Sequence, residues 1–295
     1  MTIRNAGIGL IALLLMLSGG ASAAQVCAQD ALQHSVCLPS PAGRIVSLSP
    51  GATELLFSAG AGDSVVAVSA WSDFPAEAAA LPQVGDSNRL DLEAIVSLAP
   101  DLVVAWSDGN SRSQLERIAE LGIPVFWLAP RTFEDIARAV EELALLTGQP
   151  TVGQTRAESF RQEISSLESE YARAQPVRVF YQIWDQPLMT VNREELISKA
   201  IELCGGVNVF GQLPRLVPRI SREAVLAVNP EVIVTAGEAG NSQWLEYWKQ
   251  FPSLTAVSAG NLFLEPPDLL ARPTLRIVKG ARHLCQTLEQ ARANL

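Results

Sequence analysis

The sequence is poor in the residues and motifs on which most enzymes depend. Of its 295 residues only two are histidine, and it contains no G-x-S-x-G, G-x-x-x-x-G-K-[ST], H-E-x-x-H or C-x-x-C motif. His34 is most simply a surface residue, and His283 is expected to be packed or solvated rather than to act as a general base. So few histidines also argue against a dedicated zinc or manganese receptor, which would need several nitrogen and oxygen ligands. We therefore predict no catalytic residue, no metal site and no enzyme activity.

Carboxylates are abundant, but they fall at expected helix starts and on solvent faces. Glu54, Glu93 and Glu223 each stand near the start of an apolar helical pattern. The positive end of the helix dipole favours an acid there, which is a sufficient structural reason for all three. An exported hydrolase that uses a carboxyl pair is the weaker alternative.

Positive charge is also scarce. The formal net charge is −9, and no basic stripe is present that could neutralise phosphates, which argues against a nucleic-acid partner. No run of five or more like charges occurs, so a polybasic membrane patch is not expected.

A marked apolar run stands near the N-terminus. Residues 8–17 follow Arg4 and precede the small residues Ala21, Ser22 and Ala23. This order is typical of a secretory signal peptide, and the run is too short to span a bilayer. We predict that residues 1–23 are removed and that the remainder is exported.

Four cysteines follow the predicted cleavage site: Cys27, Cys37, Cys204 and Cys285. An even number in an exported chain favours disulfides. Three pairings are possible, and the spacing does not choose between them. A Cys27–Cys37 bond would close a loop within a short N-terminal extension, residues 24–43. A zinc site is the weak alternative, because neither C-x-x-C nor paired histidines occur.

The rest of the chain alternates between strand and helix patterns, which favours α/β architecture with parallel sheets. We predict two Rossmann-like α/β lobes, residues 44–150 and 176–295. Within them the expected strands are residues 45–49, 65–69, 102–105, 124–128, 177–183 and 262–264. The expected helices begin near Thr53 and include residues 92–98, 114–121, 131–146, 194–203, 243–249 and 274–293, with a Gly-rich loop at 236–241.

Residues 151–175 stand between the two halves. The apolar residues Phe160, Ile164, Leu167 and Tyr171 recur at spacings of a single helix face. A helix of about 24 residues spans about 36 Å, the diameter of a small domain. It is predicted to be a rigid connector between the lobes, with an ordinary surface helix as the alternative.

A second indication of two lobes is an internal repeat. Residues 90–106 (LDLEAIVSLAPDLVVAW) resemble residues 220–236 (ISREAVLAVNPEVIVTA) without a gap. Glu93 aligns with Glu223, and Asp101 aligns with Glu231. Because any α/β protein repeats helix–strand units, chance similarity is the alternative, but the unbroken match favours related lobes.

Three tryptophans follow or end expected strands: Trp71, Trp106 and Trp184. Ligands of parallel α/β sheets bind at the carboxyl ends of strands, and tryptophan offers a flat apolar surface with one donor. Core packing explains any one of them, but three together favour a cleft lined with aromatic residues.

Five segments together resemble the Fe/cobalamin periplasmic-binding family, and within it the cobalamin-binding members that serve ABC importers. They are residues 44–54 (RIVSLSPGATE), 69–75, 92–106, 203–210 (LCGGVNVF) and 220–230. The resemblance covers about residues 42–290. It implies two α/β lobes joined by a backbone helix, with the ligand in the cleft between them and only slight closure on binding.

The same resemblance implies a function. The chain is expected to be a periplasmic substrate-binding protein, a monomer, that captures cobalamin or a related corrinoid and delivers it to the permease of an inner-membrane ABC transporter. A ferric siderophore or haem is the alternative ligand. No cofactor besides the ligand is expected.

Site residues carry over only in part. Glu93 and Glu223 match the acids that dock on permease arginines, and Cys204 and Cys285 match a disulfide of the C-terminal lobe. The expected ligand-binding residues are Pro50, Gly51, Trp71, Ser87, Trp106, Trp184, Asp268 and Arg272. Departures from the family pattern occur at Ser87 and near Val217, where tryptophans are expected, and at Leu269 and Leu270, where aromatics are expected.

Overall fold

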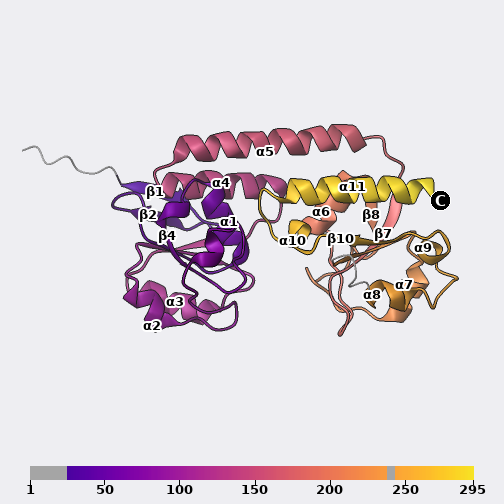
Figure 1. Cartoon of the computed structure of the whole chain (residues 1–295), viewed down its shortest axis with the longest axis horizontal. Helices are drawn as coiled ribbons and strands as arrows, with labels where there is room; N and C mark the ends of the chain where they lie inside the picture. The colour runs from indigo at the N-terminus through magenta and orange to yellow at the C-terminus, as the bar shows by residue number, and fades with distance from the viewer. Residues whose placement is uncertain (1–24, 238–242) are drawn as a thin grey trace, which may run out of the picture.

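The computed structural model describes residues 25–237 and 243–295. The predicted signal peptide and most of the Gly-rich loop at 236–241 lie outside these residues. Two α/β lobes stand side by side beneath one long helix, α5 (Pro150–Tyr171), as Figure 1 shows. The predicted fold class is confirmed.

The N-terminal lobe is built on one parallel sheet of four strands. These are β3 (Ile45–Ser47), β4 (Val65–Val68), β5 (Leu102–Trp106) and β6 (Val125–Leu128), in the order β4-β3-β5-β6. One face is covered by α1 (Pro50–Ser58) and α4 (Phe133–Leu146). The other face is covered by α2 (Leu92–Ser97) and α3 (Arg112–Glu120). Short 3-10 turns occur at Gly62–Ser64 and Ala78–Ala80.

The C-terminal lobe repeats this arrangement. Its strands are β7 (Val177–Gln182), β8 (Gly206–Asn208), β9 (Val232–Ala236) and β10 (Leu262–Glu265), all parallel, in the order β10-β9-β7-β8. In each lobe the first strand pairs with the second and third, and the fourth pairs with the third. The helices are α6 (Leu196–Leu203), α7 (Arg222–Val228), α8 (Gln243–Trp248), α9 (Thr255–Ser258), α10 (Pro267–Ala271) and α11 (Ile277–Ala293).

The sequence repeat corresponds to equivalent structure, α2–β5 in one lobe and α7–β9 in the other. Asp101 accepts hydrogen bonds from the backbone N–H groups of Gly43 and Arg44, and Glu231 accepts one from the N–H of Arg178 at 2.7 Å. Arg44 in turn donates to the carbonyl of Leu98, the C-cap of α2, and Arg178 donates to the carbonyl groups of Val228 and Asn229 at the end of α7. In both lobes the repeated acid fixes the start of the first strand, so the repeat reflects related lobes.

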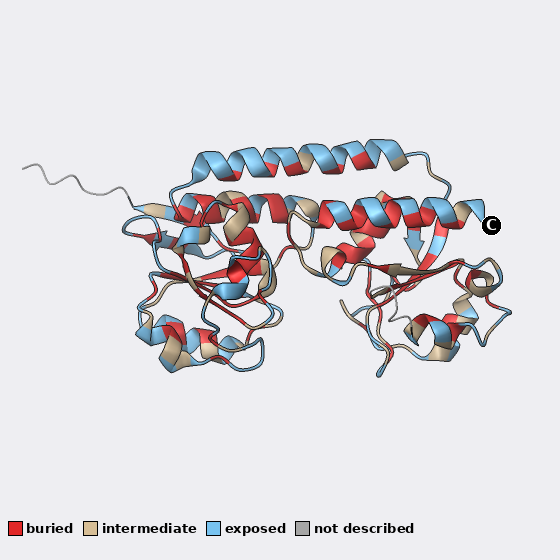
Figure 2. Ribbon diagram, viewed as in Figure 1, coloured by how far each residue is buried: buried red, intermediate tan, exposed pale blue. Residues whose placement is uncertain are grey.

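The predicted connector, α5, joins the two lobes. Its 22 residues extend about 33 Å. Figure 1 shows α4 and α11 nearly end to end beneath it, and its buried stripe faces them (Figure 2). The approach to α4 is close, because a Cβ on Gly153 would lie 2.4 Å from the Cβ of Ala144. One hydrophobic core containing Phe160, Ile164 and Leu167 continues from α1 and α4 to α6 and α11.

The N-terminal extension is a disulfide-linked hairpin on the N-terminal lobe. Strands β1 (Val26–Gln29) and β2 (Ser35–Leu38) pair antiparallel, and Cys27 bonds to Cys37. The hairpin turn also bonds to the edge strand β6, with the N–H of Ala31 donating to the carbonyl of Trp127 at 2.9 Å. The second bond, Cys204–Cys285, joins α6 to α11 in the C-terminal lobe. It is the pairing that the family resemblance implied.

Two predicted helix starts are wrong by three residues, and the other predicted helix starts agree to within two residues. Helix α1 begins at Pro50, not near Thr53, because Ser49 caps it by accepting a hydrogen bond from Ala52 N and proline is well suited to the first turn. The last helix begins at Ile277 rather than at Thr274, because Thr274 is occupied by a contact to the other lobe described below.

Candidate ligand-binding cleft

A pocket lies between the two lobes, where the sequence places the ligand. Its walls are the start of α1, the ends of β5 and β6, and the segment that follows α10. Four of the predicted ligand-binding residues line it, namely Pro50, Gly51, Trp106 and Arg272. The lobes approach each other closely here, because a Cβ on Gly51 would lie 3.5 Å from the Cδ of Pro273. The cavity holds about 200 Å³, below the range of about 300–1,000 Å³ that encloses a drug-sized ligand, so a large ligand would extend beyond it.

The three predicted tryptophans are not core residues. Trp71 is 79% exposed, Trp184 is 54% exposed and Trp106 is 36% exposed. Large side chains left so accessible are typical of binding surfaces.

Trp71 is held in a costly conformation. Its φ of 67° lies in the left-handed region, which a bulky residue occupies only when the surroundings impose it. The loop is fixed on both sides: Ala70 N donates to the carbonyl of Gly85 at 2.7 Å, and Thr53 Oγ1 donates to Ser72 Oγ at 3.1 Å. The structure therefore projects this aromatic ring into solvent from a rigid base.

Trp106 is positioned by the turn that follows it. A Cβ on Gly109 would lie 2.1 Å from the indole ring, so the ring packs directly on a backbone without a side chain. Asn110 fixes the turn, because its Oδ1 accepts from Trp106 N at 2.8 Å and its Nδ2 donates to the carbonyl of Leu48 at 2.9 Å. No sequence pattern identified Asn110.

Trp184 belongs to the C-terminal lobe and does not line the interlobe pocket. Its Nε1 donates to the carbonyl of Gln186 at 3.1 Å, and its ring meets Trp244 of α8 edge-on, with 5.9 Å between centroids. Trp244 was missed because it lies within an apolar helix pattern that is typical of packing. The two rings form an aromatic wall on this lobe.

Arg272 is surrounded by three carboxylates. Its Nη1 donates to Glu54 Oε1 at 3.0 Å and to Asp73 Oδ1 at 2.6 Å, and its Nη2 lies 3.3 Å from Asp268 Oδ1. Burial lowers the pKa of Arg272, but the hydrogen bonds to Asp73 and Glu54 outweigh it, so that this pKa is raised. The hydrogen bond from Arg272 lowers the pKa of Asp73. The predicted pair Asp268 and Arg272 is therefore brought together, and Arg272 remains charged.

Glu54 is the main residue that sequence reasoning misjudged. It is the fifth residue of α1, beyond the first turn, and its side chain is 1% exposed. Arg276 binds it through Nε at 2.8 Å and Nη2 at 2.5 Å, and Thr274 Oγ1 donates to it at 2.9 Å. The helix-dipole explanation for Glu54 is wrong, because its carboxylate is held by the opposite lobe.

The remaining predicted position, Ser87, lies in an exposed turn outside the pocket lining. The turn is closed by Asp86, whose Oδ1 accepts from the N–H groups of Asn88 and Arg89.

The two predicted docking acids occupy equivalent places. Glu93 and Glu223 are exposed in the first turns of α2 and α7, whose N-caps are Asp91 and Ser221. Hydrogen bonds from its own backbone N–H and from Ser221 lower the pKa of Glu223, so it is ionised at neutral pH. In Figure 1 both helices lie on the side of their lobes away from α5.

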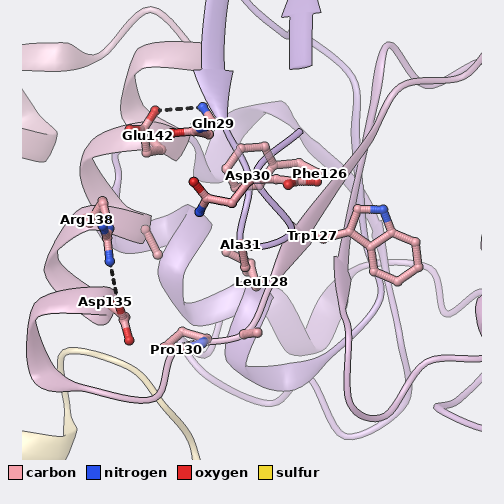
Figure 3. A pocket seen from close by; sticks show the side chains of 13 residues that line it. Gln29, Asp30, Ala31, Phe126, Trp127, Leu128, Pro130, Asp135, Arg138 and Glu142 are labelled. Atoms are coloured by element: carbon pink, nitrogen blue, oxygen red, sulfur yellow. Dashed lines mark hydrogen bonds and ion pairs between the residues drawn. The ribbon is translucent and has the colours of Figure 1, made fainter. Parts of the chain in front are cut away.

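A further cavity, of about 240 Å³, lies under the N-terminal hairpin and is shown in Figure 3. Its polar lining includes Asp135, Arg138 and Glu142 of α4, and Gln29 N donates to Glu142 Oε2 at 3.3 Å. None of the predicted ligand-binding residues lines this cavity.

Within residues 25–237 and 243–295, no cluster of three or more His, Cys, Asp or Glu side chains is suited to a metal ion. Nor does that part of the chain contain a helix that is both long and apolar enough to cross a membrane.

Two parallel-sheet lobes, a helical connection and an interlobe pocket flanked by exposed aromatic residues define a two-lobed binding protein. The chain belongs to the periplasmic binding protein family, whose model matches residues 45–269. It is 37% identical over 254 residues to the vitamin B12-binding protein of Vibrio cholerae serotype O1, covering 86% of this chain and 91% of that protein. It is 39% identical to the vitamin B12-binding protein of Yersinia pestis, covering 85% and 88% respectively.

Solved structures agree with these matches. The periplasmic vitamin B12 binding protein of Vibrio cholerae superposes with a TM-score of 0.80 at 36% identity, covering 85% of this chain and 98% of that one. A periplasmic heme-binding protein from Roseiflexus sp. RS-1 superposes with a TM-score of 0.75 at 23% identity, covering 84% and 98%. The second likeness shows the fold alone.

Proposed function

We propose that this protein is a periplasmic substrate-binding protein that captures cobalamin, or a closely related corrinoid, and delivers it to an inner-membrane ABC transporter. The observation that carries the proposal is the identity of 37% and 39% to vitamin B12-binding proteins along 86% and 85% of the chain. The exposed tryptophans and the interlobe pocket supply the physical basis for it.

A corrinoid is a bulky ligand with a flat apolar ring and polar side groups at its edge. The pocket between the lobes contains Pro50, Gly51 and Trp106, which would offer an apolar surface to one face of such a ring. Trp71 projects from the N-terminal lobe and Trp184 from the C-terminal lobe, and both leave large apolar surfaces in water without a ligand. Covering them would stabilise the complex.

Arg272 and its carboxylate partners would supply the polar contacts to the ligand. Asp73 and Asp268 are 59% and 46% exposed at their side chains, whereas Arg272 is 13% exposed. Amide groups of a ligand can accept from the guanidinium and donate to the two carboxylates.

Delivery rests on the two exposed acids. Glu93 and Glu223 stand at equivalent places on separate lobes, so each can form a charge-assisted pair with an arginine of a permease subunit. Export to the periplasm and a monomeric state accord with this role. The relatives are named for binding, and we propose that this chain likewise performs no catalysis.

The test is a titration of the purified protein, without added ligand, against cyanocobalamin, dicyanocobinamide, haemin and a ferric hydroxamate siderophore. We expect one cyanocobalamin per chain, tighter binding of both corrinoids than of haemin or the siderophore, and unchanged ligand after prolonged incubation. Binding of haemin or the siderophore in preference to both corrinoids would replace the ligand assignment. Conversion of any of the four would favour an enzyme.

A further inference from the structure

The buried carboxylate of Glu54 joins the two lobes directly. Glu54 belongs to α1 of the N-terminal lobe, and all of its side-chain partners belong to residues 272–276 of the C-terminal lobe. Those residues lie between α10 and α11. We refer to Glu54, Arg272, Thr274 and Arg276 as the interlobe cluster.

The cluster satisfies the carboxylate completely. Oε1 accepts from Arg272 Nη1 at 3.0 Å and from Arg276 Nη2 at 2.5 Å, and Oε2 accepts from Arg276 Nε at 2.8 Å and Thr274 Oγ1 at 2.9 Å. A buried carboxylate is costly unless it is paired and hydrogen-bonded in this way. Separating the lobes would leave Glu54 without its partners, so the cluster opposes separation.

The cluster also lies against the pocket. Pro50 and Gly51 precede Glu54 by about one helical turn, so they share its face of α1, and both line the cavity. On the C-terminal side Arg272 and Pro273 line the same cavity. The ion pairs and the pocket floor are therefore parts of one contact between the lobes.

The same cluster reaches the loop that carries Trp71. Arg276 places its guanidinium 3.9 Å from the ring centroid of Phe74, and Arg272 donates to Asp73 at 2.6 Å. Movement of residues 272–276 would therefore disturb Trp71 as well as the pocket.

We propose that Glu54 is the positioning residue of the ligand-binding cleft: by holding Arg272 and Arg276 it sets the separation of the lobes and directs Arg272 toward the ligand. The part of this inference that concerns the ligand rests on the proposed function, whereas the part that concerns the separation of the lobes does not. The partners of Arg272 divide into two kinds. Glu54 is enclosed, whereas Asp73 and Asp268 are accessible to a ligand. A ligand can replace the accessible contacts while Glu54 keeps the guanidinium in place.

The experiment compares Glu54→Gln, which keeps the shape and removes the charge, with Glu265→Gln, which makes the same change at a buried carboxylate that His283 and Thr287 hold within the C-terminal lobe. Spin labels are attached through Glu120→Cys in the N-terminal lobe and Gln250→Cys in the C-terminal lobe, both exposed positions. Their distance distribution is measured by pulsed dipolar spectroscopy without ligand, and the dissociation rate of cyanocobalamin is measured at 20 °C on unlabelled protein.

We expect a single narrow distribution for the parent and for Glu265→Gln, and a broad or shifted one for Glu54→Gln. We also expect dissociation to accelerate by about tenfold or more in Glu54→Gln and by less than about threefold in Glu265→Gln, because only the first change removes the buried charge that holds Arg272 from the opposite lobe. If Glu54→Gln does not fold, Arg276→Met gives the same comparison while leaving Arg272 intact.

The two proposals fail separately. A narrow, unshifted distribution with unchanged dissociation in Glu54→Gln would overturn the positioning role, even if its melting temperature falls. Absence of corrinoid binding by the parent would overturn the proposed function, and the ligand-free distances would still decide whether Glu54 sets the lobe separation.

Discussion

The two lobes share a scaffold but bring different chemistry to the cleft. Both have a sheet with the same strand order and both carry an exposed acid in the first turn of an equivalent helix. They differ where they meet: the N-terminal lobe supplies Trp106 and the carboxylate of Glu54, and the C-terminal lobe supplies Arg272. Each lobe also carries aromatic residues outside the lining of the interlobe pocket, Trp71 on one and the Trp184–Trp244 pair on the other. Repeated features thus form the scaffold and the proposed docking surface, and features that are not repeated form the proposed ligand site.

The largest contrast in stability should be between the two disulfides. Cys204–Cys285 closes 81 residues and Cys27–Cys37 closes 10. Loop-closure entropy makes their removal cost about 4.5 and about 2.7 kcal/mol respectively. Urea unfolding of Cys204→Ser/Cys285→Ser and of Cys27→Ser/Cys37→Ser measures both costs. Equal losses in the free energy of unfolding would show that the hairpin disulfide stabilises the protein as much as the disulfide of the C-terminal lobe does.

Next in size is the effect of the docking acids, which tests the equivalence of the lobes. Glu93→Ala/Glu223→Ala should reduce corrinoid uptake by cells by about tenfold or more, because each substitution removes a charge-assisted contact, while the affinity of the purified protein is unchanged. Each single variant should give an intermediate loss. Glu163→Ala, at an exposed acid of α5, is the matched control and should behave as the parent. Normal uptake by the double variant would refute the docking assignment.

The aromatic walls of the two lobes can then be compared directly. Trp71→Ala and Trp184→Ala should each weaken cyanocobalamin binding by roughly tenfold, as expected for truncation of a large aromatic contact. Trp244→Ala should weaken it less, because Trp244 acts by supporting Trp184. Tyr171→Ala on α5 serves as the control. A loss confined to one lobe would mean that the ligand is held by that lobe alone.

The smallest effect concerns a buried acid of the C-terminal lobe. Burial raises the pKa of Glu265, and the partly offsetting contacts are His283 Nδ1 at 2.7 Å and Thr287 Oγ1, which donates at 3.0 Å. The pKa of Glu265 in the folded protein exceeds the ordinary value of 4.5. The stabilisation that protonated Glu265 provides is therefore complete below pH 4.5 and is lost as pH rises through the folded pKa.

Glu265→Gln cannot ionise, so its stability relative to the parent should increase between acidic and neutral pH. Thermal melts across that range measure the difference, and Glu289→Gln on the exposed side of α11 is the control. A difference that is independent of pH would show that ionisation of Glu265 does not act on stability.

Sequence patterns predicted the parts of this fold that local residues determine. The apolar stripe of Phe160, Ile164 and Leu167 predicted α5, and the repeated acid–helix–strand pattern predicted two related lobes, which the shared strand order bears out. The family resemblance identified Cys204–Cys285, and together with the tryptophans at strand ends it identified four of the residues that line the pocket.

What the sequence could not give depends on distant contacts. Glu54 meets Arg272 and Arg276 across 218 and 222 residues, and no spacing in the chain records that meeting. Read locally, Glu54 was one more acid near a helix start, like Glu93 and Glu223. Its place beyond the first turn of α1 and its burial by the opposite lobe distinguish it from them.

Equilibrium dialysis of the purified protein against cyanocobalamin tests the central claim most directly, namely that both lobes hold one corrinoid between them. The account predicts one ligand retained per chain, with retention much reduced in Trp71→Ala/Trp184→Ala, which changes one wall on each lobe. No retention by the parent, or full retention by this double variant, would contradict it.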